Sequence, residues 1–128
     1  MRGKKHCVSG LFYSAILVAA LVVLSGCSDQ RNVHIKINSV PKGAHVLYQV
    51  VGEGVPCQGQ WIYLGNTPVQ AVRLFSENKI EDADKITLKV MHRGYIEQVK
   101  EWDGASFWNE VEERDVIFWT PQMVPSTY

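Results

Sequence analysis

The side chains that could do acid–base chemistry are densest near the end of the chain, in the run Glu110–Asp115, which holds four carboxylates. Two carboxylates that face each other across a cleft can hydrolyse a glycosidic bond. Acidic runs are more often solvated faces of a protein. The run therefore leaves a small envelope glycan hydrolase open as an alternative to a noncatalytic protein.

Other residue types that support catalysis or cofactor binding occur without the necessary spacing. His34, His45 and His92 lack the regular intervals of a metal site. The chain has no Gly-x-Ser-x-Gly nucleophile motif and no glycine-rich phosphate loop of the Walker type. We therefore predict no catalytic residue, no metal and no cofactor.

Residues 1–26 have the pattern of an export signal and are set aside from the fold. Three basic residues near the start precede the apolar core Leu11–Leu24, which has 14 residues. Crossing about 30 Å of hydrocarbon takes about 20 residues, so this core fits a secretory signal better than an uncut membrane anchor. The small residues Ser25 and Gly26 favour cleavage directly after them.

The stretch Leu24-Ser25-Gly26-Cys27 at the end of this core resembles the lipobox of bacterial lipoproteins. The resemblance implies that the thiol of Cys27 receives a diacylglycerol, that the signal is cut between Gly26 and Cys27, and that the new amino terminus is acylated. This chemistry needs cysteine, because a thiolate is the nucleophile. Two or more acyl chains hold a protein firmly to a lipid membrane, whereas one chain binds marginally.

The residue after the cysteine bears on the final membrane. In lipoproteins of many Gram-negative bacteria an aspartate at this position favours the inner membrane, and this chain has Ser28. The resemblance therefore implies the outer membrane and leaves the periplasmic or surface face open. After Cys27 the chain has 10 basic and 13 acidic residues, and this balance argues against nucleic acid as a partner.

From Val33 onward, apolar and polar residues alternate in short segments, which is typical of half-buried β-strands. Turn signals rich in glycine and proline separate these segments, and residues 52–59 form a longer loop. We expect strands within residues 33–37, 46–50, 61–64, 69–75, 86–90, 95–102 and 116–119.

Six or seven short strands within about 90 residues predict a mainly all-β domain, either a small antiparallel β-sandwich or a barrel. Residues 106–114 fit one short helix or a further strand. Ile35, Ile37, Leu88 and Val90 are expected to point into one core. The predicted divisions are a signal peptide at 1–26, a lipidated tether at 27–32, a β-domain at 33–120 and a tail at 121–128.

Three motifs, in the order in which they occur, resemble the PEGA domain: Ile37–Val46 with its Pro41-Lys42-Gly43-Ala44, then Leu64–Pro68, then Arg93–Tyr95. Lys42 stands where the family signature has glutamate. The resemblance covers about residues 33–102 and implies a small β-rich module of extracytoplasmic proteins without general catalytic residues. The long loop and the segment after Asp103 depart from the family pattern, so a function particular to this chain is expected there.

Cys57 lies in the long loop that departs from the family pattern. Cys7 belongs to the signal and Cys27 is expected to be a thioether, which leaves Cys57 as an odd cysteine in an exported protein. We expect a free, reachable thiol that forms a disulfide dimer or a mixed disulfide with a partner. A cysteine packed beneath the sheet and inert is the alternative.

The aromatic residues are expected mostly in the core. One or two of them exposed on one face would form a stacking platform for a sugar or a partner protein, and the candidates are Trp61, Trp102 and Trp108. The sequence thus predicts a lipid-anchored, noncatalytic envelope domain that binds or supports another envelope protein or a polysaccharide.

Overall fold

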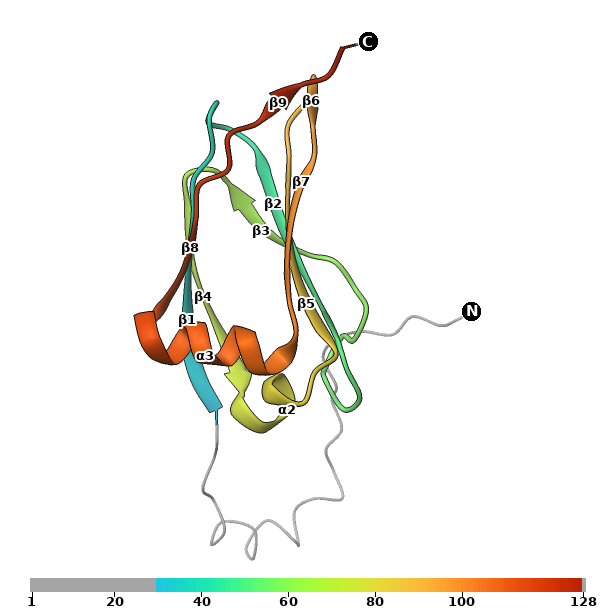
Figure 1. Ribbon diagram of the computed structural model, residues 1–128, viewed down its shortest axis with the longest axis vertical. Coiled ribbons are helices and arrows are strands. Elements are labelled where there is room, and N and C mark those ends of the chain that lie inside the picture. The colour runs from blue at the N-terminus through green and yellow to red at the C-terminus, as the bar shows by residue number, and fades with distance from the viewer. Residues whose placement is uncertain (1–29, 128) are drawn as a thin grey trace, which may run out of the picture.

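A computed structural model of the chain describes residues 30–127. The signal segment, the lipobox with Gly26 and Cys27, and the sorting residue Ser28 lie outside the described residues. The described chain is mainly β-structure, as the sequence predicted, and it also has two helices (Figure 1). Its elements are β1 (Gln30–Ile37), β2 (His45–Val51), β3 (Ile62–Asn66), β4 (Val69–Ser76), α2 (Glu77–Glu81), β5 (Lys85–Met91), β6 (Tyr95–Ile96), β7 (Gln98–Trp102), α3 (Gly104–Arg114), β8 (Val116–Trp119) and β9 (Val124–Pro125).

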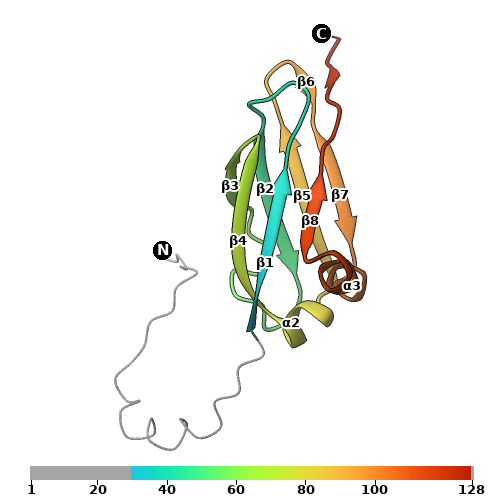
Figure 2. The same ribbon diagram turned by 90° about the vertical axis from the view of Figure 1, so that its left-hand side faces the viewer.

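Two sheets face each other and form an open sandwich (Figures 1 and 2). One sheet has the order β4-β1-β8, and the other has the order β3-β2-β5-β7. Neighbouring strands are antiparallel except β1 and β8, which run parallel. Of the two architectures that the sequence left open, the sandwich is therefore the one that forms.

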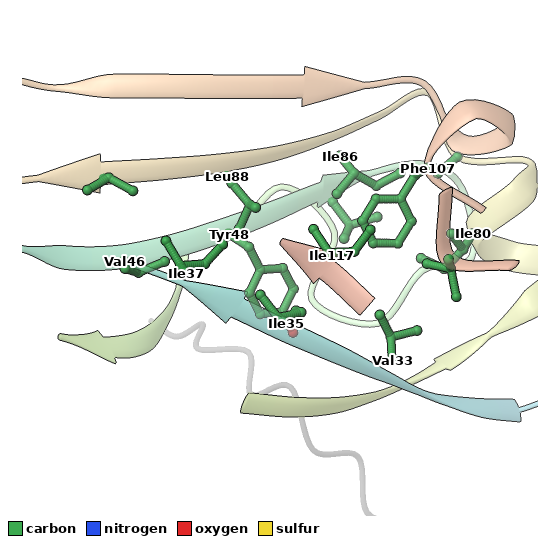
Figure 3. Close-up of a cluster of buried hydrophobic side chains, with 14 of the residues drawn as sticks. Val33, Ile35, Ile37, Val46, Tyr48, Ile80, Ile86, Leu88, Phe107 and Ile117 are labelled. Atoms are coloured by element: carbon green, nitrogen blue, oxygen red, sulfur yellow. The ribbon is translucent and has the colours of Figure 1, made fainter. Parts of the chain in front are cut away.

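The core lies between the two sheets, and alternation along the strands decides which side chains fill it. Ile35 and Ile37 of β1 and Leu88 and Val90 of β5 are all at most 3% exposed, as predicted. Aliphatic residues of β2, α2, α3 and β8 complete the same cluster (Figure 3). Tyr48 lies in it too, and burial raises the pKa of its phenol, an effect that nearby Arg73 partly offsets.

The segment 106–114, left open between helix and strand, belongs to α3. Asp103 caps this helix by accepting a hydrogen bond from the backbone N–H of Ser106 at 2.8 Å, an arrangement typical of helix starts. The same bond lowers the pKa of the Asp103 carboxyl. Phe107, Trp108 and Val111 face inward, so α3 closes one open end of the sandwich.

Three boundaries differ from the prediction. The first strand begins at Gln30, within the predicted tether, and the polar stretch after Phe75 contains the helix α2. The predicted tail after residue 120 is packed: Pro121 is buried, Met123 is 7% exposed, and β9 pairs with β6.

The sandwich has two different ends. We call the end with α2 and α3 the helical end, and β1 starts there (Figure 2). We call the opposite end the far end; it holds the loop 38–44, the turn 92–94, β6 and β9 (Figures 1 and 2). Gly43 and Gly94 take φ values of 91° and 81° in the far-end turns, a backbone conformation that favours glycine.

A buried polar network fixes the loop after β1 to the turn before β4. Thr67 Oγ1 accepts hydrogen bonds from the backbone N–H groups of Gly43 at 3.0 Å and Ala44 at 2.9 Å. Ser39 Oγ donates to the carbonyl oxygen of Pro41 at 2.7 Å and lies 2.6 Å from Thr67 Oγ1. Because Ser39 uses its proton on Pro41, Thr67 donates to Ser39. The network joins the first two PEGA-like motifs.

Replacing Thr67 with valine should lower the free energy of unfolding by about 1–3 kcal/mol, because the buried Ala44 N–H loses its acceptor and Ser39 loses a hydrogen bond. The Gly43 N–H keeps the Thr67 carbonyl at 3.0 Å. Thr87→Val is the matched control. Thr87 is 4% exposed, and its hydroxyl forms no hydrogen bond within residues 30–127, so this variant should be neutral. Urea unfolding of both variants measures the difference. Equal midpoints would show that the Thr67 hydroxyl is dispensable.

Candidate functional site

The outer face of the four-stranded sheet carries the largest exposed aromatic side chains of the described chain. Trp61 is 40% exposed, Tyr63 is 52% exposed, and Val99 is 45% exposed. Large apolar side chains that are exposed to solvent and contiguous on the surface mark interaction sites. We call this surface the aromatic face and define it by Leu47, Trp61, Tyr63, Lys89, Met91 and Val99.

The strand register makes these residues neighbours. Tyr63 of β3 pairs with Leu47 of β2, Leu47 pairs with Lys89 of β5, and Lys89 pairs with Val99 of β7. Residues directly opposite in adjacent strands have their side chains on the same face about 5 Å apart. The four side chains therefore form one row across the whole sheet.

Lys89 sits at the centre of the aromatic face, and its ammonium group contacts both an aromatic ring and a carboxylate. Its Nζ lies 4.1 Å from the ring centroid of Trp61, within the range of a cation–π contact. The same Nζ lies 3.9 Å from Glu97 Oε2. These contacts hold the Trp61 ring on the sheet while leaving part of it open to solvent.

Of the three tryptophans that were candidates for a binding face, one is exposed. Trp61 is exposed, but Trp108 is 1% exposed and belongs to the core. Trp102 pairs with Ile86 on the inner face of the sheet, and its Nε1–H donates to Glu110 Oε1 at 2.9 Å. The reason is that α3 turns Trp108 inward and the register of β7 turns Trp102 inward, so Trp61 alone remains on the predicted face.

Tyr63, Met91 and Val99 join Trp61 instead, and the sequence prediction did not assign them to a binding face. The aromatic residues, Tyr63 among them, were expected to lie mostly in the core. Two apolar residues flank it, Ile62 and Leu64, and both are partly buried. Strict alternation within that short strand was the signal that could have placed Tyr63 outward.

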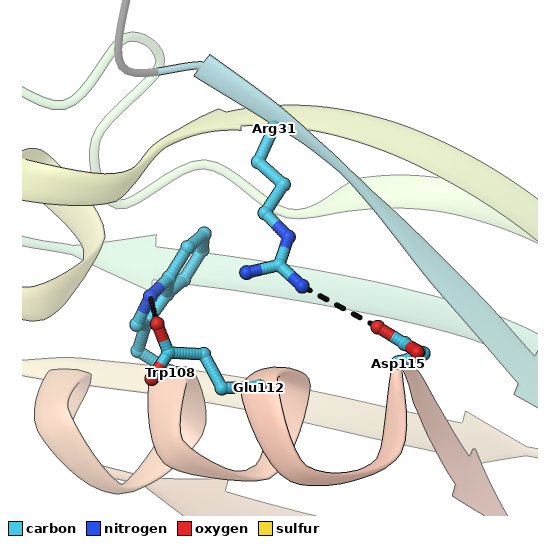
Figure 4. Close-up of polar contacts among 4 residues, drawn as sticks. All are labelled: Arg31, Trp108, Glu112 and Asp115. Carbon is cyan, nitrogen blue, oxygen red and sulfur yellow. Dashed lines mark hydrogen bonds and ion pairs between the residues drawn. The ribbon is translucent and has the colours of Figure 1, made fainter.

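The acidic run lies on α3, where two of its carboxylates bind tryptophan. Glu112 Oε2 accepts the Trp108 Nε1–H at 3.2 Å, as Glu110 does for Trp102. Asp115 forms an ion pair with Arg31 at 3.3 Å (Figure 4). Hydrolysis of a glycoside needs two carboxylates that face each other with the sugar between them. Here these carboxylates connect the helix to the sandwich.

The prediction of a free thiol at Cys57 is wrong, because this cysteine is disulfide-bonded. Its loop folds back on the sandwich: the Gly59 N–H donates to the Val50 carbonyl at 2.8 Å. Cys57 and Gln30 thereby line the same pocket of about 200 Å³. Cys7 and Cys27 lie outside the described residues. The disulfide dimer or mixed disulfide stays a prediction, and either would require exchange of the bond that Cys57 already forms.

The three histidines of the described chain occupy two places. His34 is exposed on β1, and His45 and His92 stand at the far end. Within residues 30–127 no group of three or more His, Cys, Asp and Glu side chains could hold a metal ion. None of the helices in that range has the length and apolar character needed to cross a bilayer.

No family model matches the chain, and no curated protein or solved structure matches it either. The resemblances to bacterial lipoproteins and to the PEGA domain therefore rest on the motifs themselves.

Proposed function

We propose that this chain is a lipid-anchored, noncatalytic domain of the bacterial cell envelope, and that it binds another envelope protein or a polysaccharide through the aromatic face. Cys27 is the proposed attachment point for the lipid, and the outer membrane is the proposed location. The anchor places the domain beside a membrane, and the sheet offers the partner a flat surface.

The exposure of Trp61 and Tyr63 on one face is the observation that carries the proposal. Aromatic side chains contribute more to binding than other residue types, because they bury a large area with little loss of rotamer freedom. The opposite outer face, on β4, β1 and β8, exposes Val72, Leu74 and Phe118 and serves as the comparison surface.

The start of the fold is compatible with the proposed anchor. The first strand begins at Gln30, three residues after Cys27. An extended residue spans at most about 3.6 Å, so a lipid on Cys27 would hold the helical end within about 10 Å of a membrane. The far end and much of the aromatic face would then be open to partners in the envelope.

Site-specific photocrosslinking tests the binding face. A benzoylphenylalanine placed at Tyr63 of the full chain, expressed in bacterial envelopes, should give discrete adducts after illumination. The same residue at Val72, which is 47% exposed on the opposite face, is the matched control and should give none. Adducts from Val72 alone, or from neither position, would contradict the proposed face.

A further inference from the structure

The acidic residues of the described chain are concentrated at one end of the sandwich. Glu97 is the one acidic residue of the described chain near the far end. The others lie on α2 or α3, or on strand ends and loops next to these helices (Figure 1). They are Glu53, Glu77, Glu81, Asp82, Asp84, Glu101, Asp103, Glu110, Glu112, Glu113 and Asp115.

The far end presents two cations instead. Lys42 and Arg93 are both exposed, and neither forms an ion pair with any described residue. Their turns meet in space, because a Cβ added to Gly43 would lie 3.8 Å from His92 Nε2. The nearest acidic group, Glu97, is paired with Lys89. Two positive charges without an ion-pair partner therefore stand on neighbouring turns at this end.

Aromatic rings stand beside these cations. The His92 and Tyr95 rings meet edge to face at 5.1 Å, and the His45 and Tyr63 rings lie 5.9 Å apart. Arg93, His45, Tyr95 and Glu97 are among the residues that line an open recess of about 390 Å³, and the Glu97 carboxylate there is paired with Lys89. Because Met91 lines the recess and also belongs to the aromatic face, the recess continues that face toward the far end.

We propose that this recess and the adjoining aromatic face bind a polysaccharide that carries carboxylates. This inference rests on the proposed function and names the chemical class of its ligand. The guanidinium of Arg93 can pair with a carboxylate through two hydrogen bonds, and Lys42 adds a second positive charge. The apolar C–H face of a sugar ring packs on an aromatic ring, whose own faces are apolar.

The rings favour a sugar polymer over an acidic peptide. An acidic peptide would need the two cations but would leave the exposed rings of Tyr63 and Trp61 without a flat apolar partner. The charge division also favours this end, because the acidic helical end repels an anionic polymer. With the proposed anchor at the helical end, the recess points away from the membrane.

Equilibrium binding of the full, lipid-bearing chain in detergent micelles tests the inference. The probes are polygalacturonate, neutral dextran and poly-glutamate. The chain should bind polygalacturonate at least about tenfold more tightly than either of the others, a difference of about 1.4 kcal/mol. Equal binding of dextran would show that charge is irrelevant, and equal binding of poly-glutamate would show that the sugar ring is irrelevant. Either result overturns the inference.

Paired variants locate the site. Lys42→Ala with Arg93→Ala should weaken polygalacturonate binding at least about tenfold. The control is Lys79→Ala with Lys85→Ala, which removes the same charge at the helical end and should change binding less than about twofold. Equal losses in the two pairs would overturn the inference. Crosslinking from Tyr63 in envelopes is independent: adducts there without polygalacturonate binding refute the ligand class alone.

Discussion

Replacing Trp108 with alanine is expected to lower the free energy of unfolding by about 3–5 kcal/mol. The side chain is 1% exposed, so alanine leaves a cavity the size of an indole between α3 and the sheets. The change also removes the hydrogen bond to Glu112 and the contact with the Arg31 guanidinium, 5.5 Å from the ring (Figure 4). Small domains have a total stability of about 5–15 kcal/mol, so little would remain.

Trp61→Ala is the control for Trp108, because the residue type is the same and the environment is not. Trp61 is 40% exposed, and its contact with Lys89 is worth about 0.5–1 kcal/mol. We expect a loss near that value in urea unfolding. If Trp108→Ala unfolded at the same urea concentration as Trp61→Ala, the placement of α3 over the core would be wrong.

Replacing Gly104 with alanine is expected to destabilise the fold by at least about 1–3 kcal/mol. A Cβ built on Gly104 would lie 2.1 Å from the carbonyl oxygen of Ile80 and 2.6 Å from that of Glu81. Backbone carbonyls cannot rotate away as a side chain can, so α3 would have to separate from α2. The direction of the change in stability is informative, because at an exposed helix position alanine stabilises the helix by about 1 kcal/mol relative to glycine.

Ala105→Ser is the matched control, since it adds an atom to the next residue of the same helical turn. Ala105 is exposed, and exposed substitutions change stability by about 0.5 kcal/mol or less. Thermal unfolding of both variants gives the comparison. A Gly104→Ala protein that melts at or above the wild-type temperature would refute the close contact between α2 and α3.

The strands and their inward faces could be predicted from the sequence because side chains alternate with a period of two. The pattern of β1, β2 and β5 therefore identified Ile35, Ile37, Leu88 and Val90 as core residues before any contact was known. A shift of one residue would turn these side chains to solvent, and burial of one face excludes that shift.

The helical end and the tail could not be predicted in this way. Phe107, Trp108 and Val111 fit a helix face or a strand equally well until α3 is seen to cover the open end of the sandwich. Pro121 was expected to end the folded part of the chain, because proline cannot donate a backbone hydrogen bond. Its carbonyl still accepts one from the Val40 N–H at 3.2 Å, and the Met123 N–H returns one to the Val40 carbonyl at 2.8 Å.

The candidate site was predicted only in part, because it too depends on how segments distant in sequence pack together. Of the three tryptophans proposed for a binding face, Trp61 is exposed, but residue type alone does not separate an exposed ring from a buried one. The pairing of Tyr63, Leu47, Lys89 and Val99 depends on the register of four strands. The charge division between the two ends depends on the topology, because acidic residues distant in sequence meet at the helical end.

The central claim is that a lipid on Cys27 holds this domain at a membrane, and metabolic labelling tests it most directly. Bacteria that express the full chain are fed an alkyne analogue of palmitate, and the protein is examined for label and size. The account predicts labelled, shortened wild-type protein and an unlabelled, uncut Cys27→Ala precursor, because the resemblance implies that cleavage follows lipid attachment. Cys57→Ala should keep the label. Label retained in Cys27→Ala would contradict the account.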